Sequence, residues 1–250
     1  MGYFQRNDVE PESLQSNYGR LLFRARKAGV ADAVRAIFWY QGESDGASAV
    51  AHEFGFLALC RDWLQDYPST EKVYFCQIKN GCGTAASSLA LRERQRLMAD
   101  QYPLLSIMST SAMLHWDDCH FVYEGGYRDL GNNFARLVLR DLYGQAQPSQ
   151  IDPPNFAYAY FTDGSGSNVT VLTRNPEDQL VYAAMPADFR VEDPASAMEA
   201  VVVSGSASNN VIQLDDPYPE DRPCGVLRRI AEPPRGSAPV GLCVAVCFHR

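Results

Sequence analysis

Asp117 and His120, in the sequence DDCH, are the two residues of this chain whose types and spacing most clearly suggest catalysis. Two residues separate them, so in a tight turn the carboxylate can accept a hydrogen bond from the imidazole Nδ1–H. That bond fixes the tautomer and leaves Nε2 free to take a proton from a hydroxyl. Asp118 has the wrong spacing for the same turn. Taken alone, the motif is more typical of an aspartate that caps a turn beside an ordinary loop histidine.

A second polar cluster, YQGESDG, directly follows the apolar run AIFWY. Strands of parallel sheets are buried on both faces and read as continuous apolar runs, and open α/β sheets bind ligands at the carboxyl ends of such strands. The side-chain amide of Gln41 can donate to an oxyanion. Gly42 allows a substrate to approach the backbone closely, and Glu43 can hold the loop by hydrogen bonds. The cluster therefore predicts one edge of a binding site.

Alternating helices and strands are predicted to position these clusters. Predicted helices lie at 17–29, 51–68, 88–103 and 127–144, and predicted strands at 34–40, 72–79 and 104–110. This alternation predicts an α/β fold whose parallel sheet is built from right-handed crossovers. The two polar clusters follow strands of the same sheet, so we expect Gln41 and His120 to face a common rim.

The character of the chain changes after Gly144. A segment rich in proline and polar residues, 145–155, has the composition of a linker. Beyond it lie short alternating runs separated by turn residues, which predict a small all-β, sandwich-like domain. Those runs are 157–162, 168–173, 179–184, 197–205, 209–215 and 240–249. We therefore predict domains at 1–146 and 147–250.

Composition excludes several classes of function. The formal net charge of -8 argues against nucleic acid as a partner, because phosphate binding requires a basic face. No apolar stretch approaches the roughly 20 residues that span a bilayer, so no membrane association is expected. The four histidines are scattered without the spacing of a metal site, and neither a metal nor another cofactor is predicted. These histidines are His52, His115, His120 and His249.

The seven cysteines include no C-x-x-C pair, so zinc-ribbon and thioredoxin-like sites are not expected. Cys60 and Cys76 lie in apolar segments and are predicted to be buried thiols. Cys82 and Cys119 lie in polar loops and could pair in an oxidising compartment. Cysteine usage therefore leaves the compartment open.

In combination, four blocks of this sequence resemble the SGNH (GDSL-like) hydrolases, in the branch of sialate O-acetylesterases and carbohydrate acetylesterases. The blocks are FWYQGESDG, VYFCQIKNGCG, RERQR and DDCHFVYEGGYRDLG, and the similarity runs from about Asn17 to Gly144. The resemblance implies a flavodoxin-like sheet and a Ser-His-Asp triad that cleaves acetyl esters on sugars. Carried over, Asp117 and His120 complete the triad and Gln41 helps to form the oxyanion hole. An acetylated carbohydrate substrate and a secreted or periplasmic location are likewise implied by the resemblance.

The nucleophile is the departure from that pattern. In the family, a GQSN-like serine block lies well upstream of QGES, and we expect this chain to lack it, so that its sheet is incomplete at the N-terminus and its activity impaired. LQSN, at Leu14–Asn17, is the nearest substitute. A polar segment precedes it, and Ser16 or Asn17 suits the N-cap of the next helix. Ser16 is therefore a poor candidate, and the nucleophile stays unassigned.

Two further expectations follow. Without neighbouring strands on its other side, the strand at 34–40 becomes an edge, and a long apolar edge favours association with another chain. The competing functional hypothesis is a non-catalytic glycan-binding or scaffold protein that works through residues 151–250, where Tyr158, Tyr160 and Phe161 could stack on sugars.

Overall fold

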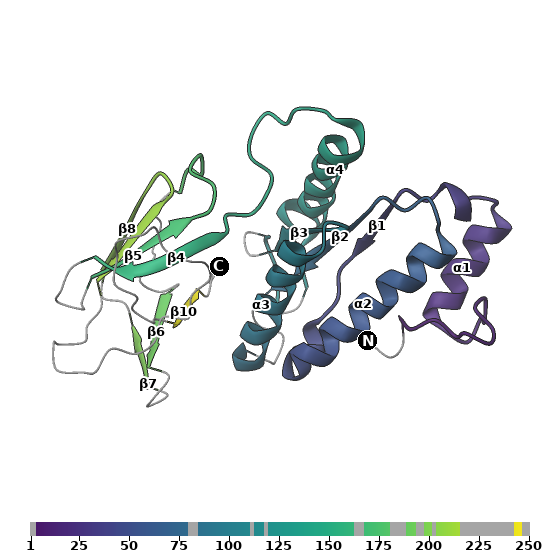
Figure 1. Cartoon of the computed structure of the whole chain (residues 1–250), viewed down its shortest axis with the longest axis horizontal. Coiled ribbons are helices and arrows are strands. Elements are labelled where there is room, and N and C mark those ends of the chain that lie inside the picture. Colours follow the sequence, from purple (N-terminus) through teal and green to yellow (C-terminus); the bar gives the residue numbers. More distant parts are fainter. Residues whose placement is uncertain are drawn as a thin grey trace. The chain divides into compact units, whose positions relative to one another are not determined.

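The computed structural model forms two compact units, Met1–Asp152 and Pro153–Arg250. Figure 1 traces their elements along the chain. The residues that it describes are 4–79, 85–110, 113–117, 120–162, 168–180, 189–193, 198–201, 204–215 and 243–246. The first unit ends within the proline-rich segment, six residues beyond the boundary expected from composition.

The first unit is an α/β domain with a parallel sheet, as predicted. Its strands are β1 (Ala36–Trp39), β2 (Lys72–Gln77) and β3 (Leu105–Ser109), in the order β1-β2-β3. Its helices are α1 (Asn17–Lys27), α2 (Ala49–Asp66), α3 (Ala85–Gln101) and α4 (Arg128–Tyr143). A helix connects each strand to the next, and α4 follows β3, so the chain alternates as the sequence pattern indicates.

Opposite faces of the sheet bury two separate cores. On one face, Val73 and Phe75 of β2 pack with residues of α1, α2 and α3. On the other face, Tyr74 and Cys76 pack with Phe134 and other residues of α4. Successive side chains of a strand point to opposite faces, so the four buried residues of β2 supply both cores. The sheet is thus the middle of three layers, and the four central residues of β2 form an uninterrupted apolar run.

Helix α1 begins at the cap expected from the sequence. The Oγ of Ser16 accepts a hydrogen bond from the backbone N–H of Gly19 at 2.9 Å, which confirms its N-cap role. The buried carboxylate of Asp66, at the end of α2, accepts from the Tyr18 hydroxyl at 2.8 Å and from Arg6 Nε at 2.8 Å. These bonds fasten α1 and the segment before it to α2.

The described part of the second unit is all-β and antiparallel. One sheet has the order β4-β5-β9-β8 and the other the order β10-β6-β7. The strands are β4 (Phe156–Phe161), β5 (Asn168–Thr173), β6 (Phe189–Asp193), β7 (Met198–Val201), β8 (Ser204–Ser208), β9 (Val211–Asp215) and β10 (Cys243–Val246). The predicted fold class, an α/β domain followed by an all-β domain, is confirmed.

Some strand predictions for this unit were wrong in detail. The run at 197–205 divides into β7 and β8. Strand β6 was not predicted, because three of its five residues are charged and the alternation is too short to stand out. Of the predicted strand at 179–184, residues 179 and 180 lie outside any strand, and the rest lie outside the described residues.

Candidate functional site

Asp117 and His120 lie on a short antiparallel ribbon between β3 and α4. His115 and Phe121 form an isolated antiparallel bridge. On either side of it, Trp116 N–H donates to the His120 carbonyl at 3.1 Å, and Val122 N–H donates to a carbonyl of the opposite segment at the same distance. The ribbon turns between Trp116 and His120, so the turn carries the predicted pair at its tip.

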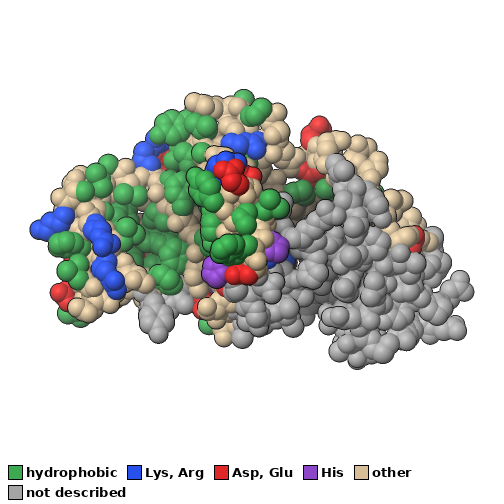
Figure 2. Space-filling model, turned by 180° about the vertical axis from the view of Figure 1, so that it is seen from behind, with side chains coloured by type: hydrophobic (Ala, Val, Ile, Leu, Met, Phe, Trp, Pro, Cys, Tyr) green, Lys and Arg blue, Asp and Glu red, His purple; other side chains and the backbone are tan. Residues whose placement is uncertain are grey.

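The Asp117 carboxylate holds both the backbone and the ring of His120. Oδ1 accepts from His120 N–H at 2.6 Å, while Nδ1 of the ring lies 2.8 Å from Oδ2. The side chains are 66% exposed for His120 and 50% exposed for Asp117. In Figure 2, histidine side chains lie at the surface beside acidic ones. Capping the turn and orienting the imidazole are therefore one arrangement, not alternatives.

This arrangement leaves the outer nitrogen of the imidazole available. A hydrogen bond from Nδ1–H to a carboxylate selects the tautomer in which Nε2 carries a lone pair. Among the residues that the structure describes, none forms a hydrogen bond with Nε2 of His120. The exposed ring can therefore accept a proton from a hydroxyl that approaches from solvent.

The ribbon is fastened to the carboxyl end of β2. Lys79 lies two residues after β2, and its Nζ donates to the Asp117 carbonyl at 3.3 Å. Nδ1 of His115 lies 2.9 Å from the same oxygen. The buried stem of Lys79 thus places the tip of the ribbon above the end of the sheet.

The Gln41 cluster lies at the same end of the sheet. Gln95 of α3 donates from Nε2 to the Gln41 carbonyl at 3.4 Å, and its Oε1 accepts from Ile78 N–H at 2.9 Å. One buried side chain therefore joins the residues that follow β1 to those that follow β2. Because Lys79 is next to Ile78, a continuous set of contacts runs from Gln41 to the tip of the ribbon.

The amide of Gln41 is fixed by Asp45. Nε2 donates to Asp45 Oδ2 at 2.8 Å, which uses one of its two N–H groups. Its Oε1 is buried and accepts no hydrogen bond from the described residues. The second N–H of Gln41 is the group that can serve an oxyanion.

Gly42 and Glu43 lie where the loop after β1 packs against α3 and enters the next helical turn. Gly42 has φ +146°, and a Cβ there would lie 3.0 Å from both Gln95 Nε2 and Ile78 Cγ2. Its missing side chain thus serves the packing of the loop against α3. Glu43 begins the 3₁₀ helix η3 (Glu43–Ser48). Burial, and the Glu43 carboxylate beside it, raise the pKa of the Tyr40 hydroxyl.

Sequence reasoning missed a second histidine–aspartate pair. Asp45 Oδ2, which accepts from Gln41, also lies 3.1 Å from Nδ1 of His52 in the first turn of α2. His52 is 2% exposed and its ring stacks on Phe56. The seven-residue separation gave no local signal, since the contact depends on how η3 leads into α2. The Asp45 carboxylate thus holds both the ring of His52 and the amide of Gln41.

The buried imidazole of His52 makes stability depend on pH. Burial lowers the pKa of His52 below its ordinary value of 6.5, although Asp45 opposes the shift. Below pH 6.5 the unfolded chain therefore binds more protons than the folded chain, and the free energy of unfolding falls as the pH falls. We expect His52→Asn, whose amide can replace Nδ1–H, to lose less stability between about pH 8 and about pH 5.5 than the wild type. Urea unfolding at both pH values measures this, and equal losses would contradict it.

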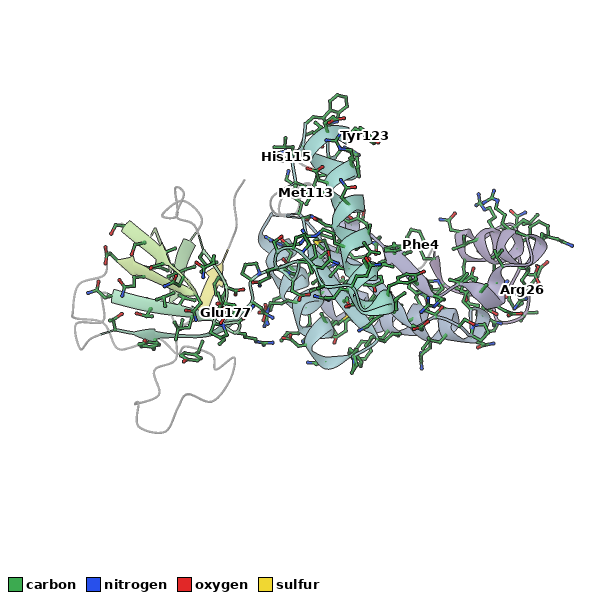
Figure 3. All side chains as sticks on the ribbon, turned by 90° about the horizontal axis from the view of Figure 1, so that it is seen from above. Phe4, Arg26, Met113, His115, Tyr123 and Glu177 are labelled. Atoms are coloured by element: carbon green, nitrogen blue, oxygen red, sulfur yellow. The ribbon has the colours of Figure 1, made fainter. Side chains whose placement is uncertain are left out.

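The other residues considered in the sequence analysis either lie far from the ribbon or fall outside the described residues. Figure 3 labels Arg26 of α1 and His115 of the ribbon in well separated parts of the first unit, so α1, which Ser16 caps, does not approach the pair. Cys60 and Cys76 are buried free thiols, as predicted, and burial raises the pKa of Cys60 to about 12. Asp118, Cys82 and Cys119 lie outside the described residues.

The described residues contain neither a candidate metal site nor a helix that could span a membrane. No group of three or more His, Cys, Asp and Glu side chains in that part of the chain could hold a metal ion. No described helix combines the length and the apolar character that a bilayer crossing requires.

Comparison with known proteins adds two findings. The family model described as carbohydrate esterase, sialic acid-specific acetylesterase, matches residues 3–140. The crystal structure of a carbohydrate acetylesterase from Xanthomonas citri matches with a TM-score of 0.65 at 16% sequence identity, covering 88% of this chain. The match covers 51% of that protein, so this chain spans about half its length. No curated protein sequence matches the chain.

Proposed function

Since the chain belongs to the carbohydrate esterase family of sialic acid-specific acetylesterases, we propose that it hydrolyses acetyl esters on sugars. The observation that carries the proposal is the Asp117–His120 pair, whose imidazole is oriented by a 2.8 Å contact and open to solvent. The contacts that join its ribbon to the Gln41 backbone support the proposal that a base and an amide donor share one rim of the sheet. These are the parts that acyl transfer to a hydroxyl requires.

In the proposed mechanism, Nε2 of His120 accepts the proton of an attacking hydroxyl while the new C–O bond forms at the acetyl carbonyl. The Asp117 carboxylate stabilises the resulting imidazolium, and the free N–H of Gln41 donates to the oxyanion. The tetrahedral intermediate then collapses, and His120 returns the proton to the departing sugar oxygen. If the hydroxyl belongs to a serine, water repeats the sequence to release acetate.

The hydroxyl itself is not assigned to a residue. Ser16 Oγ is occupied as a helix cap, and α1 lies away from the ribbon. The family resemblance implies a serine nucleophile, whereas a water activated directly by His120 would give a weaker route. Either route needs the same base, so the proposal does not depend on which one operates.

The test is acetate release from an O-acetylated sugar. Incubation of the full chain with 9-O-acetyl-N-acetylneuraminic acid should yield acetate and the deacetylated sugar in equal amounts. Proton NMR measures both products. Release at the rate of the buffer alone would contradict the proposal. An N-acetyl group on the same sugar gives an internal control, since it should stay intact.

Removal of the Gln41 amide should slow the reaction without preventing binding. We expect Gln41→Ala to lower kcat by about 10²-fold, at the low end of the range for a single oxyanion donor, because Gln41 also serves Asp45. Gln101→Ala, which removes an exposed amide at the end of α3, is the matched control. A change confined to KM would show that Gln41 binds the substrate without stabilising the oxyanion.

Association through the edge of the sheet remains a prediction for this chain. Within the described residues, β1 pairs with β2 alone, and its Phe38 side chain is 50% exposed. We propose that another chain can pair with this edge. Sedimentation velocity over a hundredfold range of concentration should show association, and a single monomeric species throughout would contradict it.

A further inference from the structure

The loop that runs from the ribbon to the start of α4 carries exposed aromatic rings as well as the candidate base. Trp116 is 78% exposed, Tyr123 is 68% exposed and Tyr127 is 45% exposed. In Figure 3, His115 and Tyr123 lie on this loop at the amino end of α4. Single exposed apolar side chains are ordinary, but several within one loop mark a binding surface.

The ribbon pairing places Trp116 beside His120. His115 is paired with Phe121, so Trp116 stands directly opposite His120 across the ribbon. Side chains of directly opposed residues lie on the same face of an antiparallel pair, with Cβ atoms roughly 5 Å apart. The two side chains are therefore expected to leave the same face of the ribbon, while the ring of the alternate residue, Phe121, is buried.

The loop is held in this form by its own packing. The buried ring of Phe121 contacts Tyr127 edge to face, with centroids 5.3 Å apart. Gly125 has φ +74°, which favours glycine, and a Cβ at Gly126 would lie 2.7 Å from the backbone oxygen of Leu114. A fixed loop can present the indole without a large cost of ordering on binding.

We propose that the exposed face of Trp116 is a platform on which the pyranose ring of the acetylated sugar stacks, with Tyr123 extending it. This inference rests on the proposed function. The C–H groups on one face of a pyranose form a flat apolar surface that matches an indole, while its hydroxyls remain in water. Because Trp116 is opposite His120 in the ribbon pairing, a ring stacked on that face could bring its acetyl ester to the base. Selectivity then comes from the sugar and not from the acyl group.

A kinetic comparison separates the platform from the chemistry. We expect Trp116→Ala to lower kcat/KM for 9-O-acetyl-N-acetylneuraminic acid about tenfold more than for ethyl acetate, mainly through KM, as truncation of an aromatic anchor does. Trp116→Phe should recover part of the loss. The control is Phe54→Ala, which removes an exposed ring from α2 and should affect both esters equally. Equal losses on both esters for Trp116→Ala would overturn the proposal.

A binding measurement keeps the inference testable if hydrolysis fails. The same sugar should protect the exposed indole from quenching by iodide in the wild type, and Trp116→Phe should abolish that response. Trp39 and Trp63 lie in or against the core and should contribute little. Binding without hydrolysis would retain the platform and reject the esterase proposal. The platform would be overturned if the sugar gave no protection, or if protection changed with protein concentration and not with sugar concentration.

Discussion

The variant His120→Ala is expected to release acetate from an O-acetylated sugar about 10⁴-fold more slowly than the wild type, at the upper end of what a general base contributes. In the proposed mechanism the imidazole of His120 accepts and returns the proton, whereas Nδ1 of His115, the other imidazole of the ribbon, contacts the Asp117 carbonyl. The exposed position of His120 means that the substitution creates no buried cavity. Stability should therefore be retained while activity is lost, as measured by acetate release and by urea unfolding on the same preparation.

His115→Asn is the matched control for the first prediction. It removes an imidazole from the same ribbon, where Nδ1 contacts the Asp117 carbonyl and has no contact with the carboxylate. We expect less than about a tenfold loss from it, since removing a neutral hydrogen bond costs on the order of 1 kcal/mol. Similar losses in both variants would mean that the form of the ribbon, rather than the base, limits the rate.

The second large effect is expected for Asp117→Asn, which should lower kcat by about 10³-fold. The amide can still accept from His120 N–H, so the turn is kept, but it no longer stabilises an imidazolium and can reverse the tautomer. The loss should be smaller than the roughly 10⁴-fold seen for a buried triad aspartate, because this carboxylate is 50% exposed and solvent screens it.

Two outcomes would contradict the second prediction. Retention of full activity by Asp117→Asn would mean that the carboxylate merely caps the turn. Asp117→Ala distinguishes the roles further, because it also removes the cap from His120 N–H. We expect it to be both slower than wild type and less stable, by about 1 kcal/mol for the lost cap, which urea unfolding would detect.

Local patterns predicted the elements that position the site. The four central residues of β2 are buried on both faces and form a continuous apolar run, and α1 begins at a serine cap as expected. The contact between Asp117 and His120 was predictable because a turn of four residues leaves few ways to place the two side chains. Features that depend only on local spacing, such as a buried strand, a helix cap or a contact within one turn, were therefore predictable from the sequence.

Features that depend on tertiary packing were not predictable in this way. The contact of Asp45 with His52 requires a particular direction of α2 after η3. The role of Gly42 is set by Gln95 and Ile78, which lie far along the chain. Asp45 also accepts from the Gln41 amide, so the partners that hold this side chain come from tertiary packing.

Chemical rescue of His120→Gly is the measurement that tests the central claim most directly. Position 120 is open to solvent, so added imidazole can enter the space that the ring leaves beside Asp117. Acetate release by this variant should be close to the buffer rate alone and should rise with imidazole concentration, beyond what imidazole does without protein. Release at the wild-type rate without imidazole, or no response to imidazole in a folded variant, would contradict the assignment of His120 as the base.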